Sequence, residues 1–254
     1  MTEQEFLRTY DSSKYEKPSV TADTLIFTVS EDHELELLLI KRAGYPFKGK
    51  WAIPGGFVDI NESVEEAADR ELKEETGLDH IYLEQLYTFG NVNRDPRMRV
   101  ISVAHMALVP QNSLKIEAGD DAAEAGLFLI KQNENGYTFY SEEKGITLTE
   151  TDLAFDHSQI IRAALKRLKG KVEYSNIAFE LLGDKHRFSI YELQRICEAI
   201  TCEETNNANF KKSFKRRYLN TGKVVMLDEK CTEYSKRPSS YYSITDEFNN
   251  ERSV

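Results

Sequence analysis

The stretch Gly56-Phe57-Val58-Asp59-Ile60-Asn61-Glu62 is followed, after seven further residues, by Arg70-Glu71-Leu72-Lys73-Glu74-Glu75-Thr76-Gly77-Leu78. If residues 63–76 form a helix, side chains three and four positions apart share one face, so Glu71, Glu74 and Glu75 converge. Like charges at this spacing repel by roughly a few tenths of a kcal/mol per pair. Three converging carboxylates therefore predict a hard divalent cation, Mg2+ (or Mn2+), which accepts oxygen ligands together with the phosphates of a substrate.

The same helix needs a buried side and defined ends. We expect the opposite side to be a core-facing stripe made of Val64, Ala67, Ala68 and Leu72. The loop Trp51–Gly56 precedes the helix, and Gly77 is placed to end it as a C-cap. A solvated acidic helix is the usual interpretation of a Glu-rich run, but it explains neither this loop nor the fixed spacing. The pattern therefore favours a metal site.

Charge is divided unevenly along the 254 residues. Residues 1–156 carry 15 Lys and Arg against 30 Asp and Glu, a net of −15, whereas residues 157–254 carry 18 against 13, a net of +5. This split predicts two domains with different partners, although a net of +5 also fits mere solubility. No apolar run approaches the roughly 20 residues of a membrane span, and three cysteines without a CxxC pair fit a reduced, cytoplasmic protein.

The first domain, residues 1–156, alternates strand-like segments with helix-like ones. The expected strands are Pro18–Thr28, Glu36–Ile40, Tyr82–Phe89, Val100–Val109 and Ala125–Ile130. They flank the helix at 63–76, and a second helix is expected at about Ser158–Leu168, within a connecting helix at 157–170. This order predicts an α/β fold, an α/β/α sandwich around a mixed sheet.

The second domain, residues 157–254, changes to helices followed by a hairpin. Ser189 and Glu192 form a capping box, and a second helix at about Asn207–Leu219 places Phe210, Phe214 and Tyr218 on one stripe. Val224–Leu227 and Ser240–Ile244 pair as a hairpin, and residues 246–254 are expected to be a flexible tail. Two helices and a hairpin are the order of a winged helix-turn-helix. Its expected DNA contacts are Lys211, Lys212, Lys215, Arg216, Arg217, Lys236 and Arg237.

Gly56–Leu78 fills every fixed position of the pattern GX5EX7REUXEEXGU, with U apolar, and so resembles the Nudix (MutT-like) hydrolase superfamily. Four further segments resemble its ADP-ribose-handling branch: Tyr87–Gly90, Arg94–Val103, Gly119–Ala125 and Leu153–His157. Three segments of the second half resemble the winged helix of NrtR-type regulators: Phe188–Gln194, Asn209–Lys212 and Lys236–Tyr242. Regulators of this branch often lack some of the fixed residues of the Nudix box, whereas this sequence keeps all of them.

The resemblance implies roles for individual residues. Glu71, Glu74 and Glu75 would hold the metal with the carbonyl group of Gly56, and Glu124 would add a catalytic carboxylate. Arg94, Arg97 and Arg99 would clamp phosphates or a ribose, and Phe89 would stack on adenine unless it packs in the core. Glu62 and Arg70 are expected to form an internal ion pair. His157, after Asp156, is expected to make a helix-start contact rather than to act as a base.

Two functions follow from these roles. The first is Mg2+-dependent hydrolysis of a nucleoside diphosphate derivative, with ADP-ribose cleaved to AMP and ribose 5-phosphate. The alternative is an NrtR-like transcriptional regulator that binds duplex DNA and uses its Nudix domain as a sensor of ADP-ribose or a sugar. A homodimer is expected in either case, because Nudix domains and winged-helix regulators usually pair and two-fold operators require a dimer.

Overall fold

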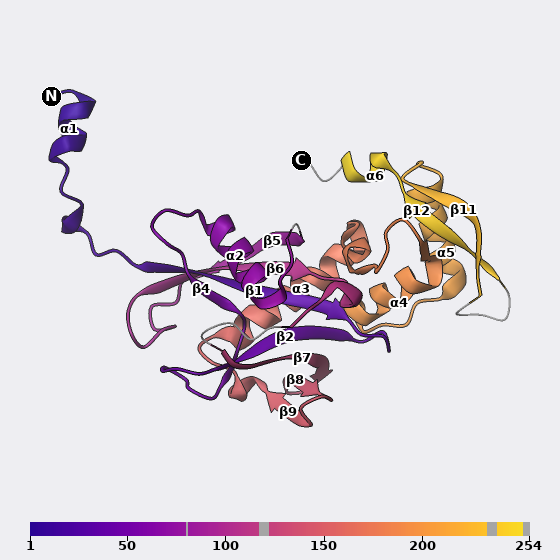
Figure 1. Ribbon diagram of the computed structural model, residues 1–254, viewed down its shortest axis with the longest axis horizontal. Helices are drawn as coiled ribbons and strands as arrows, with labels where there is room; N and C mark the ends of the chain where they lie inside the picture. The colour runs from indigo at the N-terminus through magenta and orange to yellow at the C-terminus, as the bar shows by residue number, and fades with distance from the viewer. Residues whose placement is uncertain (80, 117–121, 233–237, 251–254) are drawn as a thin grey trace.

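The computed structural model describes residues 1–79, 81–116, 122–232 and 238–250. A short helix α1 (Glu3–Thr9) and a 3-10 turn (Ser12–Lys14) precede the first strand. They stand away from the rest of the molecule (Figure 1), and α1 has no buried residue. No helix in the described part of the chain is both long and apolar enough to cross a membrane.

One large sheet organises the first domain (Figure 1). Its strands follow the order β5-β6-β1-β2-β7-β8-β9, and two short strands are added at its side, β3 to β2 and β4 to β1. Their bounds are Ser19–Val29 (β1), Leu35–Arg42 (β2), Trp51–Ala52 (β3), Gly55–Phe57 (β4), Tyr82–Phe89 (β5), Val100–Leu108 (β6), Ala122–Asn133 (β7), Gly136–Ser141 (β8) and Ile146–Thr149 (β9). β1 and β6 are parallel and the other pairs are antiparallel, so the sheet is mixed as predicted.

Two helices cover the two faces of this sheet and confirm the α/β/α sandwich. On one face Leu72 of α2 (Val64–Thr76) packs with Ile26 and Leu38. On the other, α3 (His157–Tyr174) contributes Ile161 and Leu165 to the main core. A 3-10 turn at Glu150–Asp152 leads into α3.

The second domain is a winged helix-turn-helix, as predicted. A 3-10 turn (Ile177–Leu181) and β10 (Phe188–Ser189) lead to α4 (Ile190–Thr201), then to α5 (Asn207–Phe214), which continues as a π-helical turn, η5 (Lys215–Leu219). The wing is formed by β11 (Val224–Cys231) and β12 (Ser239–Ile244), in a sheet of order β10-β12-β11. Ser189 caps α4 through the predicted box with Glu192.

The predicted flexible tail is wrong for its first part. Asp246–Asn250 form a short helix, α6, and Phe248 is completely buried. Its ring lies 4.7 Å from that of Phe179 and 6.4 Å from that of Tyr218. Burial of this aromatic ring explains why the segment is ordered. Residues 251–254 lie outside the described residues, and the division of the chain at residue 156 stays a prediction, since one core cluster runs through both halves.

Candidate functional site

Local sequence fixes both ends of α2. The side chain of Ser63 accepts a hydrogen bond from the backbone N–H of Glu66, and the Glu66 side chain accepts one from the backbone N–H of Ser63. At the other end Gly77 adopts φ +68°, a left-handed conformation that glycine reaches without strain, and its N–H donates to the carbonyl of Lys73. The predicted C-cap at Gly77 is therefore confirmed, whereas the capping box of Ser63 and Glu66 was not predicted.

The predicted separation of the carboxylates from the core-facing stripe is wrong. Ala67, Glu71 and Glu75 lie four residues apart, so they share one face, and all three are buried. Glu71 and Glu75 are only 8% and 5% exposed, whereas Glu74 points outward. The alanines pack against Ala22 of β1 in the first half of the helix. One face of α2 therefore carries Ala67, then Glu71 one turn later and Glu75 two turns later.

Gly56 is required by its distance from one of these carboxylates. A Cβ atom on Gly56 would lie 2.1 Å from Oε1 of Glu71, so any side chain here would push the Glu71 carboxylate away from its position. Gly56 is held there because β4 pairs with β1, with Gly56 opposite Ala22. The loop therefore brings its backbone directly to Glu71, the arrangement expected if Gly56 provides a carbonyl ligand.

Arg70 binds the acidic groups around it. It donates to Glu62 at 3.0 Å, the predicted internal ion pair, and to Glu71 at 2.7 Å. It also lies 3.5 Å from Glu74 and donates to the carbonyl of Phe57 at 3.3 Å. Burial raises the pKa of the Glu71 carboxyl, and the neighbouring Arg70 guanidinium opposes this rise. Arg70 is thus the positive charge that balances the cluster in this structure.

The donors suit a hard cation by type, since two buried carboxylates and a backbone carbonyl offer only oxygen. Among the described residues, however, no three His, Cys, Asp or Glu side chains form a group that could hold a metal ion. The residues that would hold Mg2+ or Mn2+ are Glu71 and Glu75, with Glu74 and Gly56 beside them. The assignment of these four residues as ligands stays a prediction.

Arg94 does not lie free for a substrate. Its guanidinium makes two hydrogen bonds to Asp156, of 3.1 and 2.8 Å, and lies 3.6 Å from Asp23. Ser102 donates to Asp23, and Arg94, Asp156 and Asp23 are almost completely enclosed. In this structure Arg94 belongs to a buried ion pair, and its contact with phosphates stays a prediction. Asp23 was not predicted as a partner, although an aspartate inside the apolar run of β1 was a signal for one.

His157 makes the helix-start contact that its position predicts. Its Nδ1 accepts a hydrogen bond of 2.9 Å from the backbone N–H of Ile53, in the loop that leads to Gly56. Burial lowers the pKa of His157 and keeps the ring neutral, so Nδ1 is an acceptor. With Arg94 bound to Asp156, the start of α3 is attached to two loops of the site.

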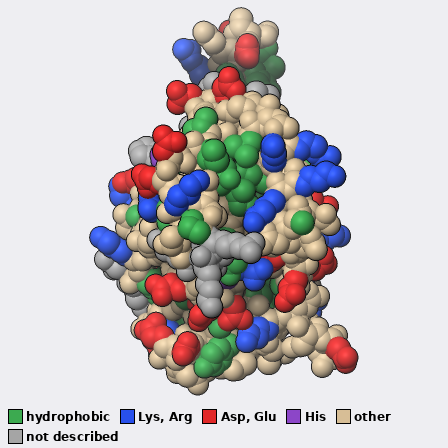
Figure 2. All heavy atoms as spheres, turned by 90° about the vertical axis from the view of Figure 1, so that its right-hand side faces the viewer, with side chains coloured by type: hydrophobic (Ala, Val, Ile, Leu, Met, Phe, Trp, Pro, Cys, Tyr) green, Lys and Arg blue, Asp and Glu red, His purple; other side chains and the backbone are tan. Residues whose placement is uncertain are grey.

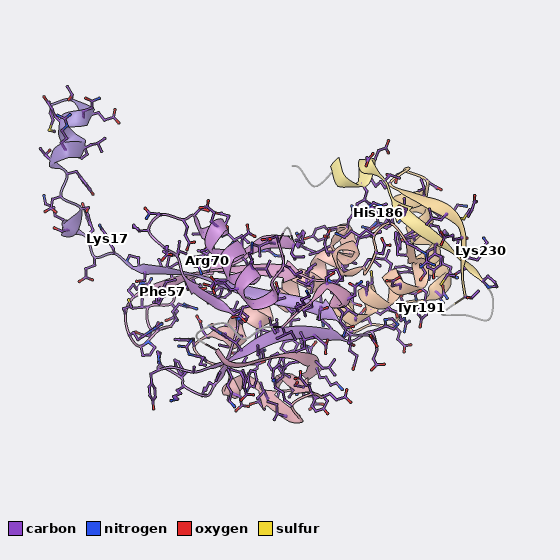
Figure 3. All side chains as sticks on the ribbon, viewed as in Figure 1. Lys17, Phe57, Arg70, His186, Tyr191 and Lys230 are labelled. Carbon is purple, nitrogen blue, oxygen red and sulfur yellow. The ribbon has the colours of Figure 1, made fainter. Side chains whose placement is uncertain are left out.

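The other predicted substrate residues, Arg97, Arg99 and Phe89, contact groups of the protein itself. Arg97 makes a two-bond ion pair with Asp95, and its guanidinium lies 5.5 Å from the ring centre of Phe57. Arg99 donates to the carbonyl of Asn91 at 3.0 Å. Phe89 is partly buried against the main core, the alternative use that its position allowed. Figure 3 shows Phe57 and Arg70 at the end of the molecule away from the winged helix.

Glu124 is occupied elsewhere. It lies opposite Lys41 across the β2–β7 pair and accepts a hydrogen bond of 2.8 Å from the Lys41 ammonium. Both side chains are largely exposed, and Lys41 lowers the pKa of the Glu124 carboxyl. Its catalytic role stays a prediction. Residues 117–121, which precede β7 in the sequence, lie outside the described part of the chain.

The winged helix exposes most of the predicted DNA-binding residues. Phe214 and Tyr218 are buried and Phe210 packs against the core, which leaves four cations exposed: Lys211, Lys212, Lys215 and Arg216. Figure 2 faces the winged-helix end and shows Lys and Arg side chains gathered to one side of it. Arg217 differs, because it turns inward and donates to the carbonyls of Glu173 and Ser175 at 3.2 and 3.3 Å. Lys236 and Arg237 lie outside the described residues.

An α/β/α sandwich with the box on α2, followed by a winged helix, defines a two-domain protein of the Nudix class. The NUDIX domain profile matches residues 20–145, and the profile of the NrtR DNA-binding winged helix domain matches residues 178–244. The chain belongs to the family of Nudix proteins with an NrtR-type winged helix.

Three comparisons illustrate this membership. The chain is 35% identical to the "ADPR responsive transcriptional repressor NtrR" of Acinetobacter baylyi, over 95% of this chain and 88% of the relative. It is 38% identical to the ADP-ribose pyrophosphatase of Methanocaldococcus jannaschii, over 61% of this chain and 78% of that enzyme. The crystal structure of Shewanella oneidensis NrtR with a 27mer DNA superimposes with a TM-score of 0.67 and 28% identity, over 89% of this chain and 93% of that chain.

Proposed function

We propose that this protein is a DNA-binding transcriptional regulator whose Nudix domain senses ADP-ribose. The exposed basic side of α5, on a winged helix, is the observation that carries this proposal. The A. baylyi relative is named as an ADPR-responsive repressor, and the S. oneidensis relative was crystallised with DNA. These relatives favour the regulator over the hydrolase that the sequence placed first.

The charge distribution supports contact with DNA. Four cations gather on α5 and the turn that follows it, although the whole chain carries a net charge of −10. Lysine and arginine side chains at a helix surface bind phosphates and release counterions, so the affinity depends strongly on salt. A homodimer is part of this proposal, because a two-fold operator presents two half-sites.

Helix α3 gives the regulator a physical connection between ligand and DNA. Its 18 residues correspond to about 27 Å of helix. At its start Asp156 and His157 bind Arg94 and the N–H of Ile53, in loops of the Nudix site. At its end the carbonyl of Glu173 accepts a hydrogen bond from Arg217, next to the basic residues. A ligand that moves the site loops therefore acts on the winged helix through one rigid element.

Selection of genomic fragments at about 0.15 M salt tests the regulator, since a Debye length near 8 Å suppresses loose attraction there. We expect one operator to be enriched and its binding to change with ADP-ribose. Lys212→Ala with Arg216→Ala should weaken binding and reduce the log-log salt slope by up to about 0.9 per lost phosphate contact. The control Lys131→Ala with Lys166→Ala removes two exposed charges elsewhere. Fragments no better enriched than random duplex, with or without ADP-ribose, would refute the regulator.

Hydrolysis of ADP-ribose is a second candidate, favoured by the intact box and by the buried position of Glu71 and Glu75 beside Gly56. A bound divalent cation would neutralise phosphate charge and make a water more acidic. The carboxylates would hold that charge, and Arg70 would hold the loop against the helix. Product analysis with ADP-ribose and Mg2+ or Mn2+ should give AMP and ribose 5-phosphate. Glu75→Gln should lower turnover by orders of magnitude with the fold intact, and an inert wild-type protein at saturating metal contradicts this candidate.

A further inference from the structure

A groove of about 930 Å3 lies where the Nudix domain meets the winged helix. One wall comes from β5 and β6 of the large sheet, a second from the end of α3, and a third from η5 and the start of the wing. None of its lining residues belongs to the box or to the loop with Arg94. Its volume falls in the range of about 300–1,000 Å3 that is usual for small-molecule sites.

Positive charge dominates the lining of this interdomain groove. Lys171, Lys185, Arg217 and Lys223 line it, against a single carboxylate, that of Glu180. Lys185 pairs with Glu180 at 2.7 Å, and Lys171 pairs with Glu84 behind the wall. Arg217 instead donates to two neutral carbonyl groups, which leave its charge uncancelled. Burial also lowers the pKa of Lys185, an unfavourable effect that a bound anion offsets.

Aromatic side chains lie beside these cations. Tyr82, Tyr174 and Tyr218 line the same groove, and Tyr174 is 71% exposed although its residue type is usually half-buried or more. A tyrosine ring offers a flat face for stacking, and lysine and arginine offer charge-assisted donors to phosphate. Rings and cations together match a ligand that has both an aromatic base and phosphates.

We propose that the interdomain groove is a second ligand site, separate from the Nudix box, and that it binds a nucleotide. The phosphates lie against Lys185, Lys223 and Arg217, and the base stacks on Tyr174 at the rim. Such a ligand touches the sheet, α3 and the turn after α5 at once. It therefore favours one arrangement of the two domains and acts on DNA binding independently of ADP-ribose.

Titration calorimetry of the full chain with ATP, in EDTA to prevent metal-dependent hydrolysis, tests the site. Lys185→Gln with Lys223→Gln keeps a donor toward Glu180 and removes two charges, so the dissociation constant should rise at least tenfold, since each charge-assisted contact contributes roughly that factor. The matched control, Lys131→Gln with Lys166→Gln, should bind ATP like the wild type. Equal affinity in the groove variant and the wild type would overturn the proposal.

Photo-crosslinking of the wild-type protein with 8-azido-ATP locates the nucleotide without any substitution. Crosslinked peptides should contain Tyr174 or Tyr82. Crosslinks confined to residues 51–62 and 87–99 would place the nucleotide at the Nudix site and overturn the proposal, as would their complete absence. The crosslinking result tests the groove site even if the groove variant fails to fold. A failure to find an operator would refute the regulator but would not change the crosslinks, so the two proposals can fail separately.

Discussion

Replacing Arg94 by methionine separates two roles for this residue. In the structure Arg94 is enclosed, makes two hydrogen bonds to Asp156 and lies 3.6 Å from Asp23. Methionine fills most of the volume of the arginine stem but removes the charge. Arg94→Met therefore leaves the nearly buried carboxylates of Asp156 and Asp23 without the cation that lies close to both. The sequence-based role, a clamp on substrate phosphates, predicts instead a stable variant that has lost its ligand.

The magnitude follows from the burial of the pair. Arg94 and Asp156 side chains are 4% and 11% exposed, so solvent screens them little. Removing one partner of a buried ion pair costs about 3–5 kcal/mol. For a chain of this size, about 2–4 °C of melting temperature accompany each kcal/mol, so Tm should fall by roughly 6–20 °C. A surface arginine would change stability by only about 0.5 kcal/mol.

Urea unfolding followed by circular dichroism measures this difference. Asp156→Asn and the double variant complete a cycle with Arg94→Met, and the double variant should be less destabilised than the sum of the single ones. Asp23 remains in the double variant, so full recovery is not expected. A loss below about 1 kcal/mol for Arg94→Met, or simple additivity in the cycle, would show that the buried pair does not hold the site together.

Three further perturbations follow from the structure. Burial raises the pKa of Glu71, so this carboxyl begins to be protonated at a higher pH than an ordinary glutamate. The affinity for Mn2+ should fall as the pH is lowered through that range, and calorimetry should show no such fall for Glu71→Gln. Gly56→Ala, with its Cβ 2.1 Å from the Glu71 carboxylate, should abolish metal binding, whereas Gly44→Ala, which meets nothing within 4 Å, should bind normally. Phe248→Ala should lower the free energy of unfolding by about 3–5 kcal/mol in urea, because its buried ring packs against that of Phe179. A loss below about 1 kcal/mol would instead support the predicted flexible tail.

Sequence predicted best what local chemistry determines. The ends of α2 follow from Ser63, Glu66 and Gly77, which act on their own backbone neighbours. The bounds of β5 agree residue by residue, since β-forming residues stand between polar turns. The order of the two helices and the wing in the second domain was also predicted from short segments of sequence. β8 and β9 were not predicted, although both contain β-forming residues; β8 pairs with β7 and β9 with β8.

Contacts between distant segments were not predictable in the same way. Arg94 and Asp156 are 62 residues apart, and the sequence around either residue does not indicate which residue it pairs with. Phe248 packs against Phe179 and Tyr218, which lie 69 and 30 residues before it in the chain. The predicted separation of the carboxylates from the core-facing stripe was wrong for another reason. Helical spacing alone places Ala67 and Glu71 on one face, so the spacing was misinterpreted.

The positive charge of the second half shows why net charge alone does not define a surface. The net of +5 over residues 157–254 indicated either a partner different from that of the acidic half or mere solubility. In the structure Lys211, Lys212, Lys215 and Arg216 do lie outward. Another set, Lys171, Lys185, Arg217 and Lys223, faces the interdomain groove. Arg217 adjoins the outward cations in sequence but belongs to the groove by its contacts with α3. The cations of this half therefore lie on two surfaces, and a phosphate bound in the groove would contact Arg217, which directly follows the outward-facing Arg216 in the chain.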